Sequence, residues 1–272
     1  MKQKRNIHKL AASNIAWDFE DNDLVLELLG SYNFRAIEVA PTKLFADEPY
    51  SLNNILNAEK FANMLANFYS LSCCSIQSIW YGLEQSIFAG PEEREYLLFY
   101  TSKAMDFAKA IGAHNIVFGC PRNRNMSFDS DLEIAYDFFE KLAILAEQKE
   151  VFFALEANPA SYGTNFLNNN TEVADFIHQI GAAHLTMNYD LGAAVENSEN
   201  ISLFQTHKNY ISHIHISEPM LAPVVHRKQQ TLLSKQIKAT NYEKFISLEM
   251  RRSSIQEFER SVQIIGEIFD VA

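Results

Sequence analysis

Four residues of types that bind divalent cations lie at the ends of the last four apolar runs of the chain. In chain order they are Glu156, Asp190, His215 and Glu249. A single carboxylate at a strand end is more often a helix cap or a solvated group, but four successive ends carry the pattern. Three carboxylates brought together repel one another unless a cation or shared protons neutralise them. Carboxylate with imidazole suits Mn²⁺, Mg²⁺, Co²⁺ or Zn²⁺, and the absence of thiolate argues against a structural zinc site.

The stretch 210–218, Tyr-Ile-Ser-His-Ile-His-Ile-Ser-Glu, places two histidines inside a β-branched apolar run. Residues i and i+2 of a strand face the same side, so His213 and His215 should project together. Buried imidazoles need partners, because an unpaired buried polar group costs about 1–3 kcal/mol. Both histidines can be satisfied by backbone carbonyls, which leaves a structural alternative. We expect His213 to pack behind a ligand rather than to be one.

Short apolar runs alternate with longer amphipathic stretches, which indicates βα units around a parallel sheet. Gly181 ends the helix after the fifth run, and we expect Thr171 to cap its start. Eight units in 272 residues favour a single (β/α)8 TIM barrel spanning residues 1–272. The active site of such a barrel lies at the carboxyl ends of its strands. The expected strands are 10–17, 36–40, 73–80, 115–120, 151–156, 184–190, 210–218 and 245–249.

Composition limits the classes of protein to consider. The net charge of −11 argues against nucleic acid as a partner, since such proteins usually carry a basic surface. No apolar run approaches the roughly 18 residues of a membrane span, and the polar first six residues are not followed by a signal-peptide core. The three cysteines, Cys73, Cys74 and Cys120, cannot pair completely. We therefore expect a cytoplasmic protein with reduced thiols and no membrane partner.

Several segments make the chain similar to the xylose isomerase-like barrel superfamily of sugar isomerases and epimerases. They are Phe-Ala-Leu-Glu at 153–156, Tyr-Asp at 189–190, His-Ile-His at 213–215 and Ser-Leu-Glu at 247–249. The segments at 13–17, 118–121 and 215–223 resemble a subgroup labelled sugar phosphate isomerases/epimerases. The resemblance implies a carbohydrate or sugar phosphate as the substrate. Helices of such barrels often use exposed aromatic residues for dimer contacts, so a homo-oligomer is an open alternative.

Ketose 3-epimerases of this superfamily bind one divalent metal through a Glu-Asp-His-Glu set, which matches Glu156, Asp190, His215 and Glu249 here. The resemblance implies that the metal holds two adjacent substrate oxygens, while Glu156 and Glu249 move the carbon-bound proton. Such residue types fit that chemistry. Proton removal next to a carbonyl gives an enediolate that a Lewis acid stabilises, and a second acid can return the proton to the opposite face.

Three positions depart from the epimerase pattern. Ala193 stands where the epimerases have a histidine, Leu221 replaces an arginine and Tyr162 replaces a substrate-binding glutamate. The metal-binding residues therefore match, whereas the contacts to a free ketohexose do not. Ala193 also argues against the endonuclease IV branch of the superfamily, whose trinuclear site needs a histidine there.

Other residues near the expected mouth of the barrel are candidates for substrate contact. Their alternative roles are solvated loop charges for the arginines, pocket walls for the aromatics and ordinary structural hydrogen bonding for the rest. The candidates are Trp17, Glu38, Gln77, Trp80, Asn158, His213, Arg122 and Arg227.

Three functions remain compatible with these residues. The first is a metal-dependent sugar or sugar-phosphate isomerase or epimerase. The second is a dehydratase of an inosose-type keto-polyol, which begins with the same enolisation and then expels water. The third is a catalytically inactive sugar-binding barrel, which the changes at Ala193 and Leu221 favour.

Overall fold

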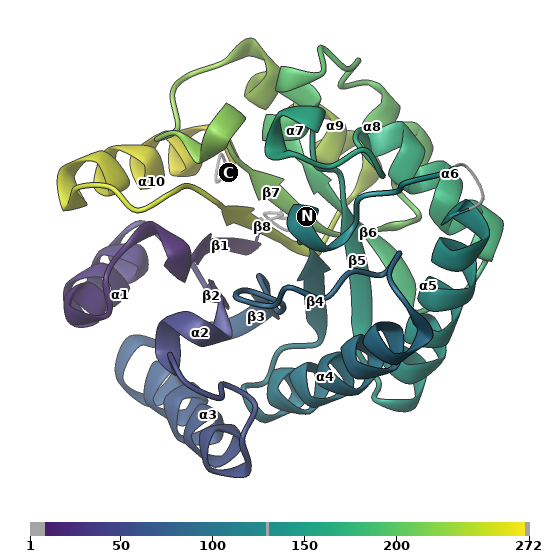
Figure 1. Ribbon diagram of the computed structural model, residues 1–272. Coiled ribbons are helices and arrows are strands. Elements are labelled where there is room, and N and C mark those ends of the chain that lie inside the picture. Colours follow the sequence, from purple (N-terminus) through teal and green to yellow (C-terminus); the bar gives the residue numbers. More distant parts are fainter. Residues whose placement is uncertain (1–8, 129–130, 270–272) are drawn as a thin grey trace.

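Eight parallel strands close into a barrel in the computed structural model, which describes residues 9–128 and 131–269 (Figure 1). Each strand pairs with its sequence neighbours, and the first pairs with the last, so the described sheet has no free edge. The predicted (β/α)8 barrel is confirmed. The strands are β1 (Lys9–Ser13), β2 (Ala36–Val39), β3 (Ser72–Ile76), β4 (Asn115–Phe118), β5 (Phe152–Glu156), β6 (Leu185–Asp190), β7 (Ile211–Ile216) and β8 (Phe245–Leu248).

Helices surround the barrel as an outer ring (Figure 1). They are α1 (Asn22–Ser31), α2 (Pro41–Leu44), α3 (Leu52–Met64), α4 (Pro91–Ala110), α5 (Asp131–Gln148), α6 (Asn170–Ile180), α7 (Leu191–Glu196), α8 (Leu203–His207), α9 (Lys228–Thr240) and α10 (Ile255–Phe269). Short turns of helix add η1 (Asn14–Ala16), η2 (Phe19–Asp21), η3 (Leu65–Tyr69), η4 (Pro121–Asn123), η5 (Ala160–Tyr162) and η6 (Pro219–Leu221). No helix of the described part is both long and apolar enough to cross a bilayer.

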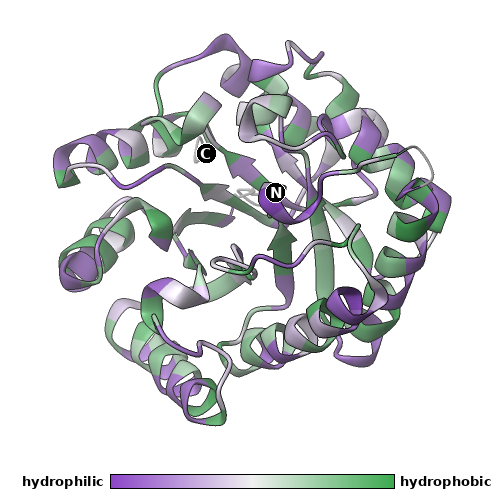
Figure 2. Cartoon of the chain, in the orientation of Figure 1, coloured by the Kyte–Doolittle hydropathy of each residue, from purple (hydrophilic) through white to green (hydrophobic). Residues whose placement is uncertain are grey.

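Apolar side chains fill the layer between the strands and the helices. Hydrophobic residues run along the strands and the inner sides of the helices, and hydrophilic ones gather on the outer sides (Figure 2). Aromatic rings make much of this layer: Phe118 of β4 packs edge-on against Trp80 at 4.7 Å and against Phe139 of α5 at 5.6 Å. Burying each such ring stabilises the fold by about 1.5–3 kcal/mol. This packing fixes the strand ends relative to one another.

A chain of neutral polar side chains crosses the interior of the barrel. Asn115 of β4 donates a hydrogen bond to Oγ of Ser75 on β3 at 3.0 Å, and Ser212 of β7 donates to Oδ1 of Asn115 at 2.7 Å. Thr186 of β6 lies 2.7 Å from Oγ of Ser212 and completes the chain. Because β4 and β7 are not neighbours in the sheet, the Asn115–Ser212 bond spans the barrel. These buried groups satisfy one another, as the cost of unpaired buried polar atoms requires.

The structure differs from the sequence-based expectations at several element ends. The third strand ends at Ile76 rather than at residue 80, since Ser78 has a positive φ of 53° that leaves the strand conformation. The first strand ends at Ser13 rather than at residue 17, because Oγ of Ser13 accepts the Ile15 N–H and starts the turn η1. Helix α6 is capped by Asn169, whose Oδ1 accepts the Glu172 N–H at 2.9 Å, and not by Thr171. The segment between β6 and β7, for which the sequence predicts no helix, contains two short ones, α7 and α8.

Candidate metal centre

The four ligand-type residues meet at one end of the barrel. Glu156 and Asp190 are the last residues of β5 and β6, His215 is the last but one of β7, and Glu249 directly follows β8. Each offers one ligand atom, and these atoms all lie within 4.8 Å of one another. All four side chains are buried. Parallel pairing of four adjacent strands brings them together, because it aligns the carboxyl ends of those strands.

The imidazole of His215 is the centre of the cluster. Its Nδ1 lies 2.8 Å from Oε1 of Glu156 and 3.1 Å from Oε2 of Glu249, yet it makes no well-directed hydrogen bond with either oxygen. Its Nε2 lies 2.7 Å from Oε2 of Glu38 on β2, which is a hydrogen-bonding distance. The two ring nitrogens therefore have different partners, and only Nδ1 faces the other ligand-type residues.

Neutral donors hold the carboxylates in place. Asn188 donates to Oε1 of Glu156 at 2.6 Å, and Ser217 donates to Oδ2 of Asp190 at 2.5 Å. The backbone N–H of Ala193 donates to Oδ1 of Asp190 at 2.5 Å, so this carboxylate also caps α7. Donors of this kind fix the orientation of ligand carboxylates around metal sites.

Crowding of the carboxylates appears in their protonation. Burial, and then the neighbouring Glu156 and Glu249, raise the pKa of Asp190 to about 8. Burial likewise raises the pKa of Glu249, although His215 opposes the change. Burial alone lowers the pKa of His215, but Glu249 and Glu38 outweigh it and hold that pKa well above its ordinary value. The cluster thus takes up protons to relieve its negative charge.

A divalent cation fits this cluster on three grounds. Four oxygen and nitrogen donors converge within ligand range of one another. The buried Nδ1 of His215 has no well-directed hydrogen bond, so no protein acceptor occupies this ring nitrogen. No lysine or arginine of residues 9–128 or 131–269 forms an ion pair with the three carboxylates, so a cation would supply the missing charge. The donor set is the one that Mn²⁺, Mg²⁺, Co²⁺ and Zn²⁺ accept.

A cavity of about 170 Å³ opens onto the cluster. Glu156, Asp190 and Glu249 form part of its wall, together with the predicted contact residues Gln77 and Asn158. Tyr162 and Leu221, two of the positions where the sequence departs from the epimerase pattern, also line it. This part of the wall therefore consists of an aromatic and an aliphatic side chain.

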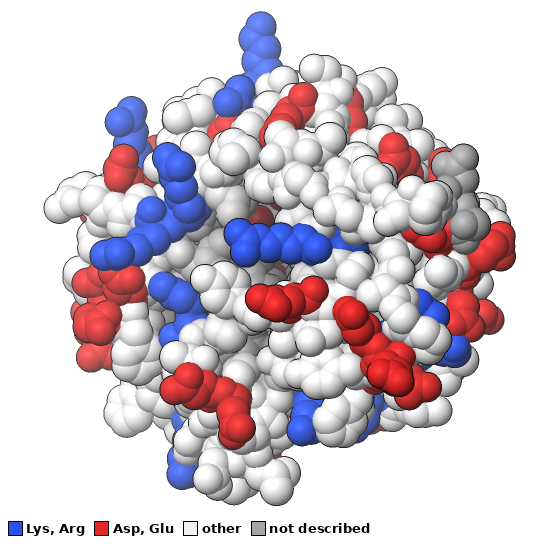
Figure 3. Space-filling view, viewed as in Figure 1, with Lys and Arg blue, Asp and Glu red and all other residues white. Residues whose placement is uncertain are grey.

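A second cavity of about 680 Å³ adjoins the first and shares Ser78, Cys120 and Pro121 with it. Trp80 and Arg122 line this larger space. Trp80 is only 1% exposed and donates its Nε1–H to Thr101, whereas Arg122 is exposed. The barrel seen end-on is hollowed near its centre, where a basic and an acidic side chain lie close together (Figure 3).

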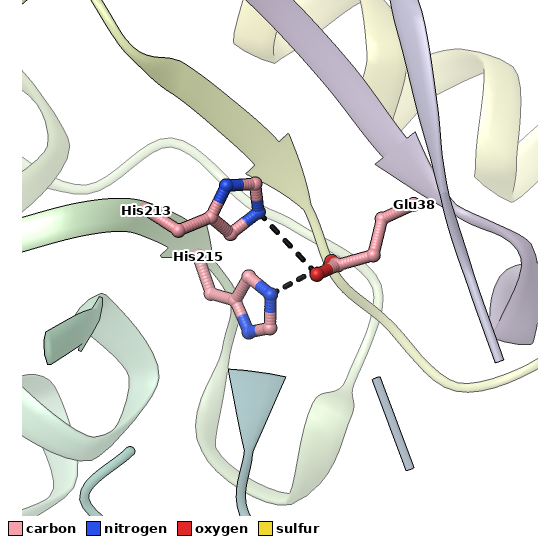
Figure 4. Close-up of side chains that lie close together, drawn as sticks. All are labelled: Glu38, His213 and His215. Carbon is pink, nitrogen blue, oxygen red and sulfur yellow. Dashed lines mark hydrogen bonds and ion pairs between the residues drawn. The ribbon is translucent and has the colours of Figure 1, made fainter. Parts of the chain in front are cut away.

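The remaining candidate contact residues lie away from the smaller cavity. Trp17 is buried against Phe258 and donates its Nε1–H to Asn22 at 2.8 Å. Arg227 pairs with the buried carboxylate of Glu218 in the loop after β7. Glu38 and His213 are 0% and 1% exposed and lie beside His215 inside the barrel (Figure 4).

Several residues of the site are not among those predicted from the sequence. Asn188 precedes Asp190 by two positions, Ser217 follows His215 by two, and Ser247 precedes Glu249 by two. The two-residue period of a strand would have found them, because it places each on the face of its neighbouring ligand. Gly119 carries no such signal. A Cβ at this position would lie 2.7 Å from Oε2 of Glu156, so glycine is the residue that leaves room for the carboxylate.

Comparison with known proteins places this architecture in a family. The model of the xylose isomerase-like TIM barrel family matches residues 26–268. The chain belongs to this family. The matched segment contains every strand of the xylose isomerase-like barrel except β1, and all four residues of the cluster. A search of curated proteins gave no significant match.

Sugar epimerases are among the solved structures that this xylose isomerase-like barrel resembles. The 3-keto-D-glucoside 4-epimerase of E. coli shares 15% identity at a TM-score of 0.75, over 96% of this chain and 98% of the epimerase. The D-psicose 3-epimerase of Clostridium cellulolyticum H10 also shares 15% identity at a TM-score of 0.75, over 97% and 100% of the two chains. An AP endonuclease of family 2 from Brucella melitensis shares 13% identity at a TM-score of 0.73, over 92% and 96%. At these identities the likeness concerns the fold.

Proposed function

We propose that this protein is a divalent-metal-dependent isomerase or epimerase of a sugar or sugar phosphate. The observation that carries the proposal is the convergence of Glu156, Asp190, His215 and Glu249 beside a cavity at the strand ends. Membership of the xylose isomerase-like family and the likeness to sugar epimerases support it. The cluster would hold Mn²⁺, Mg²⁺, Co²⁺ or Zn²⁺.

The reaction would begin at a carbon next to a carbonyl group. One of the two glutamates accepts the proton of that carbon, and the other delivers a proton to the opposite face. Both carboxylates line the cavity. Glu156 ends β5 and Glu249 follows β8, so β6 and β7 lie between them in the sheet. The bound cation, when present, supplies Lewis-acid stabilisation of the negative charge of the enediolate.

The protein environment suits Glu249 to carry a proton. Burial raises its pKa, so the protonated form that donates is more accessible than that of a solvated glutamate. Glu156 is restrained by the amides of Asn188 and Asn158, the latter at 3.4 Å from Oε2. Restraint of this kind keeps the carboxylate oriented for proton transfer, which requires hydrogen-bond reach of the reacting group.

Exchange of substrate hydrogen with solvent tests the proposal. The metal-loaded protein is incubated in D₂O with a panel of ketoses, inososes and their phosphates, and incorporation is followed by NMR. We expect deuterium at the carbon next to the carbonyl, and Glu249→Gln to abolish it while the fold remains. Glu218→Gln, which removes a buried carboxylate outside the cluster, should retain exchange. Retained exchange in Glu249→Gln would refute the role of this residue.

A catalytically inactive sugar-binding barrel is the second candidate. Tyr162 and Leu221 in the cavity wall favour it, because they remove the polar contacts that position a free ketohexose in the epimerases. The same panel distinguishes the outcomes. Deuterium incorporation with product supports the isomerase, loss of water indicates a keto-polyol dehydratase, and sugar binding without exchange indicates the inactive barrel.

A further inference from the structure

The carboxylate of Glu38, on β2, contacts His215 at Nε2, the ring nitrogen that faces away from the other ligand-type residues. Glu38 projects inward from β2, is 0% exposed and does not line the cavity beside the cluster. Figure 4 shows its carboxylate beside the rings of His213 and His215, with one nitrogen of each imidazole turned toward it. A buried carboxylate is costly unless charge or hydrogen bonds compensate it. The question is therefore what Glu38 does there.

Its two oxygens have different surroundings. Oε2 accepts a hydrogen bond from Nε2 of His215 at 2.7 Å and another from Oγ of Ser247 at 3.1 Å. Oε1 lies 3.4 Å from Nε2 of His213 and has no hydrogen bond within the described residues. Glu38 is thus bound most closely to His215, the one imidazole of the metal cluster.

This contact determines which ring nitrogen of His215 carries a proton when a metal is bound. A carboxylate that accepts from Nε2 requires an N–H there, and the neutral ring then leaves its lone pair on Nδ1. Nδ1 is the atom that lies between the oxygens of Glu156 and Glu249. Carboxylates in this position orient metal-binding histidines and increase their basicity in many proteins.

We propose that Glu38 is a positioning residue that holds His215 with Nε2 protonated and Nδ1 directed at the cation. The inference rests on the proposed metal site and deepens it. It also replaces substrate contact as the role of Glu38, because a side chain without exposed surface or a place in the cavity wall does not meet a ligand. Ser247 supports the same arrangement by fixing Oε2.

Two substitutions separate positioning from general stability. Glu38→Gln keeps an oxygen that can accept the Nε2–H, whereas Glu38→Met removes every acceptor at similar size. Thr186→Val is the matched control, because it removes a buried hydroxyl bonded to Ser212 inside the barrel without touching any residue of the cluster. Mn²⁺ binding is measured by titration followed by electron paramagnetic resonance, and unfolding by urea denaturation.

We expect one Mn²⁺ per wild-type chain and an affinity about 10–100-fold lower in Glu38→Met. Glu38→Gln should recover a large part of this loss, and Thr186→Val should bind Mn²⁺ as the wild type does even if it unfolds more easily. In the Zn²⁺-loaded wild type, ¹⁵N NMR should show a His215 Nε2–H that exchanges slowly with water. In Glu38→Met this proton should exchange faster.

Three outcomes would overturn the inference. Unchanged Mn²⁺ affinity in both Glu38 variants would show that His215 needs no support. A second Mn²⁺ per chain that disappears in Glu38→Met would indicate a cation between Glu38, His213 and His215, which also offer ligand atoms within 4.8 Å of one another. Equal losses of Mn²⁺ affinity in Glu38→Met and Thr186→Val would show that the effect of Glu38 is only a loss of folding stability. A wild-type chain that binds no divalent cation would instead remove the proposed function itself.

Discussion

The two halves of the barrel present different chemistry to the same cavity. Strands β5 to β8 end in the charged cluster, whereas the cavity wall after β3 and β4 is neutral and contains Gln77, Ser78, Gly119 and Cys120. The charged side chains of this cavity wall thus come from among four adjacent strands, whose register is fixed by direct hydrogen bonding between neighbours. Under the proposed function, one half would bind the ion and move the proton, while the other half would shape the space for the substrate.

Glu38 is the exception that connects the halves. It belongs to β2, yet it contacts His215 of β7 and Ser247 of β8 across the barrel. The half of the barrel formed by β1 to β4 therefore contributes one carboxylate to the surroundings of His215, and this carboxylate does not line the cavity. Substitutions in the first half should therefore alter metal affinity only where they reach a residue of the cluster, as at Glu38 and Gly119, and otherwise substrate binding alone.

The largest effect is expected for Asp190→Asn. The amide oxygen of asparagine can still accept from the Ala193 N–H, and its NH2 group can donate to the Ser217 hydroxyl, which then acts as the acceptor. The fold should therefore remain, but the charged ligand is lost. We expect metal affinity to fall by more than the roughly 10–100-fold typical of supporting residues. Isothermal titration with Mn²⁺ measures it. Asp106→Asn, which removes a surface partner of Lys149, is the control and should leave the affinity unchanged.

Metal binding should strengthen as the pH rises. Because the pKa of Asp190 is raised to about 8, its carboxyl is protonated below that pH in the metal-free protein, and the cation must displace the proton. Each displaced proton corresponds to about tenfold in affinity per pH unit. Because the pKa values of His215 and Glu249 are raised as well, the affinity should rise by at least about tenfold per pH unit between pH 6 and 8, and less steeply once Asp190 has lost its proton above pH 8. Titrations at several pH values measure it, and Asp190→Asn should show a shallower slope. A flat profile in the wild type would contradict the prediction.

Gly119→Ala should weaken the metal site from the neutral half. The added methyl group would collide with Oε2 of Glu156 and force the carboxylate to move. Overpacking of this kind costs about 1–3 kcal/mol, which corresponds to roughly 5- to 150-fold in affinity. Mn²⁺ titration measures it, and Gly90→Ala provides a control with open space around the added atom. Equal affinity in both variants would show that Glu156 has room to shift.

The smallest effect is expected for Gln77→Ala. Gln77 lines the cavity and donates to Oγ of Ser13, but it touches none of the four ligand-type residues. Loss of one substrate hydrogen bond costs about 0.5–1.5 kcal/mol, so KM should rise by roughly two- to tenfold. Steady-state kinetics measure KM, and metal affinity should not change. A loss of Mn²⁺ binding in this variant would break the division between the halves.

The barrel and the four cluster residues follow from local patterns in the sequence. The last four apolar runs have the length of a strand, and each has a Glu, an Asp or a His at or near its end. This pattern already places the four residues at one end of a parallel sheet. Long-range contacts do not follow in this way. The partner of His215 is Glu38, 177 residues earlier, and nothing in the run Ala-Ile-Glu-Val indicates which strand its carboxylate meets.

The backbone conformation of the loops does not follow from local sequence patterns either. Met220 and Leu221 both have positive φ angles of 58° and 53°, a conformation that their side chains do not favour. The Arg251 N–H donates to the Leu221 carbonyl at 2.7 Å and helps to hold this turn over the cavity. Trp17 shows a similar limit. The sequence places it near a strand end as a candidate substrate contact, whereas the fold directs its Nε1–H to Asn22 and packs its ring against Phe258.

The polar chain formed by Ser75, Asn115, Ser212 and Thr186 has a kinetic consequence. It fills the interior on the side of the cluster away from the cavity, since Thr186 and Ser212 precede Asp190 and His215 on their strands. Under the proposed function, reactant and product would therefore bind at the same place, on the cavity side of the cluster. Each would exclude the other, and we expect product to act as a competitive inhibitor of the forward turnover.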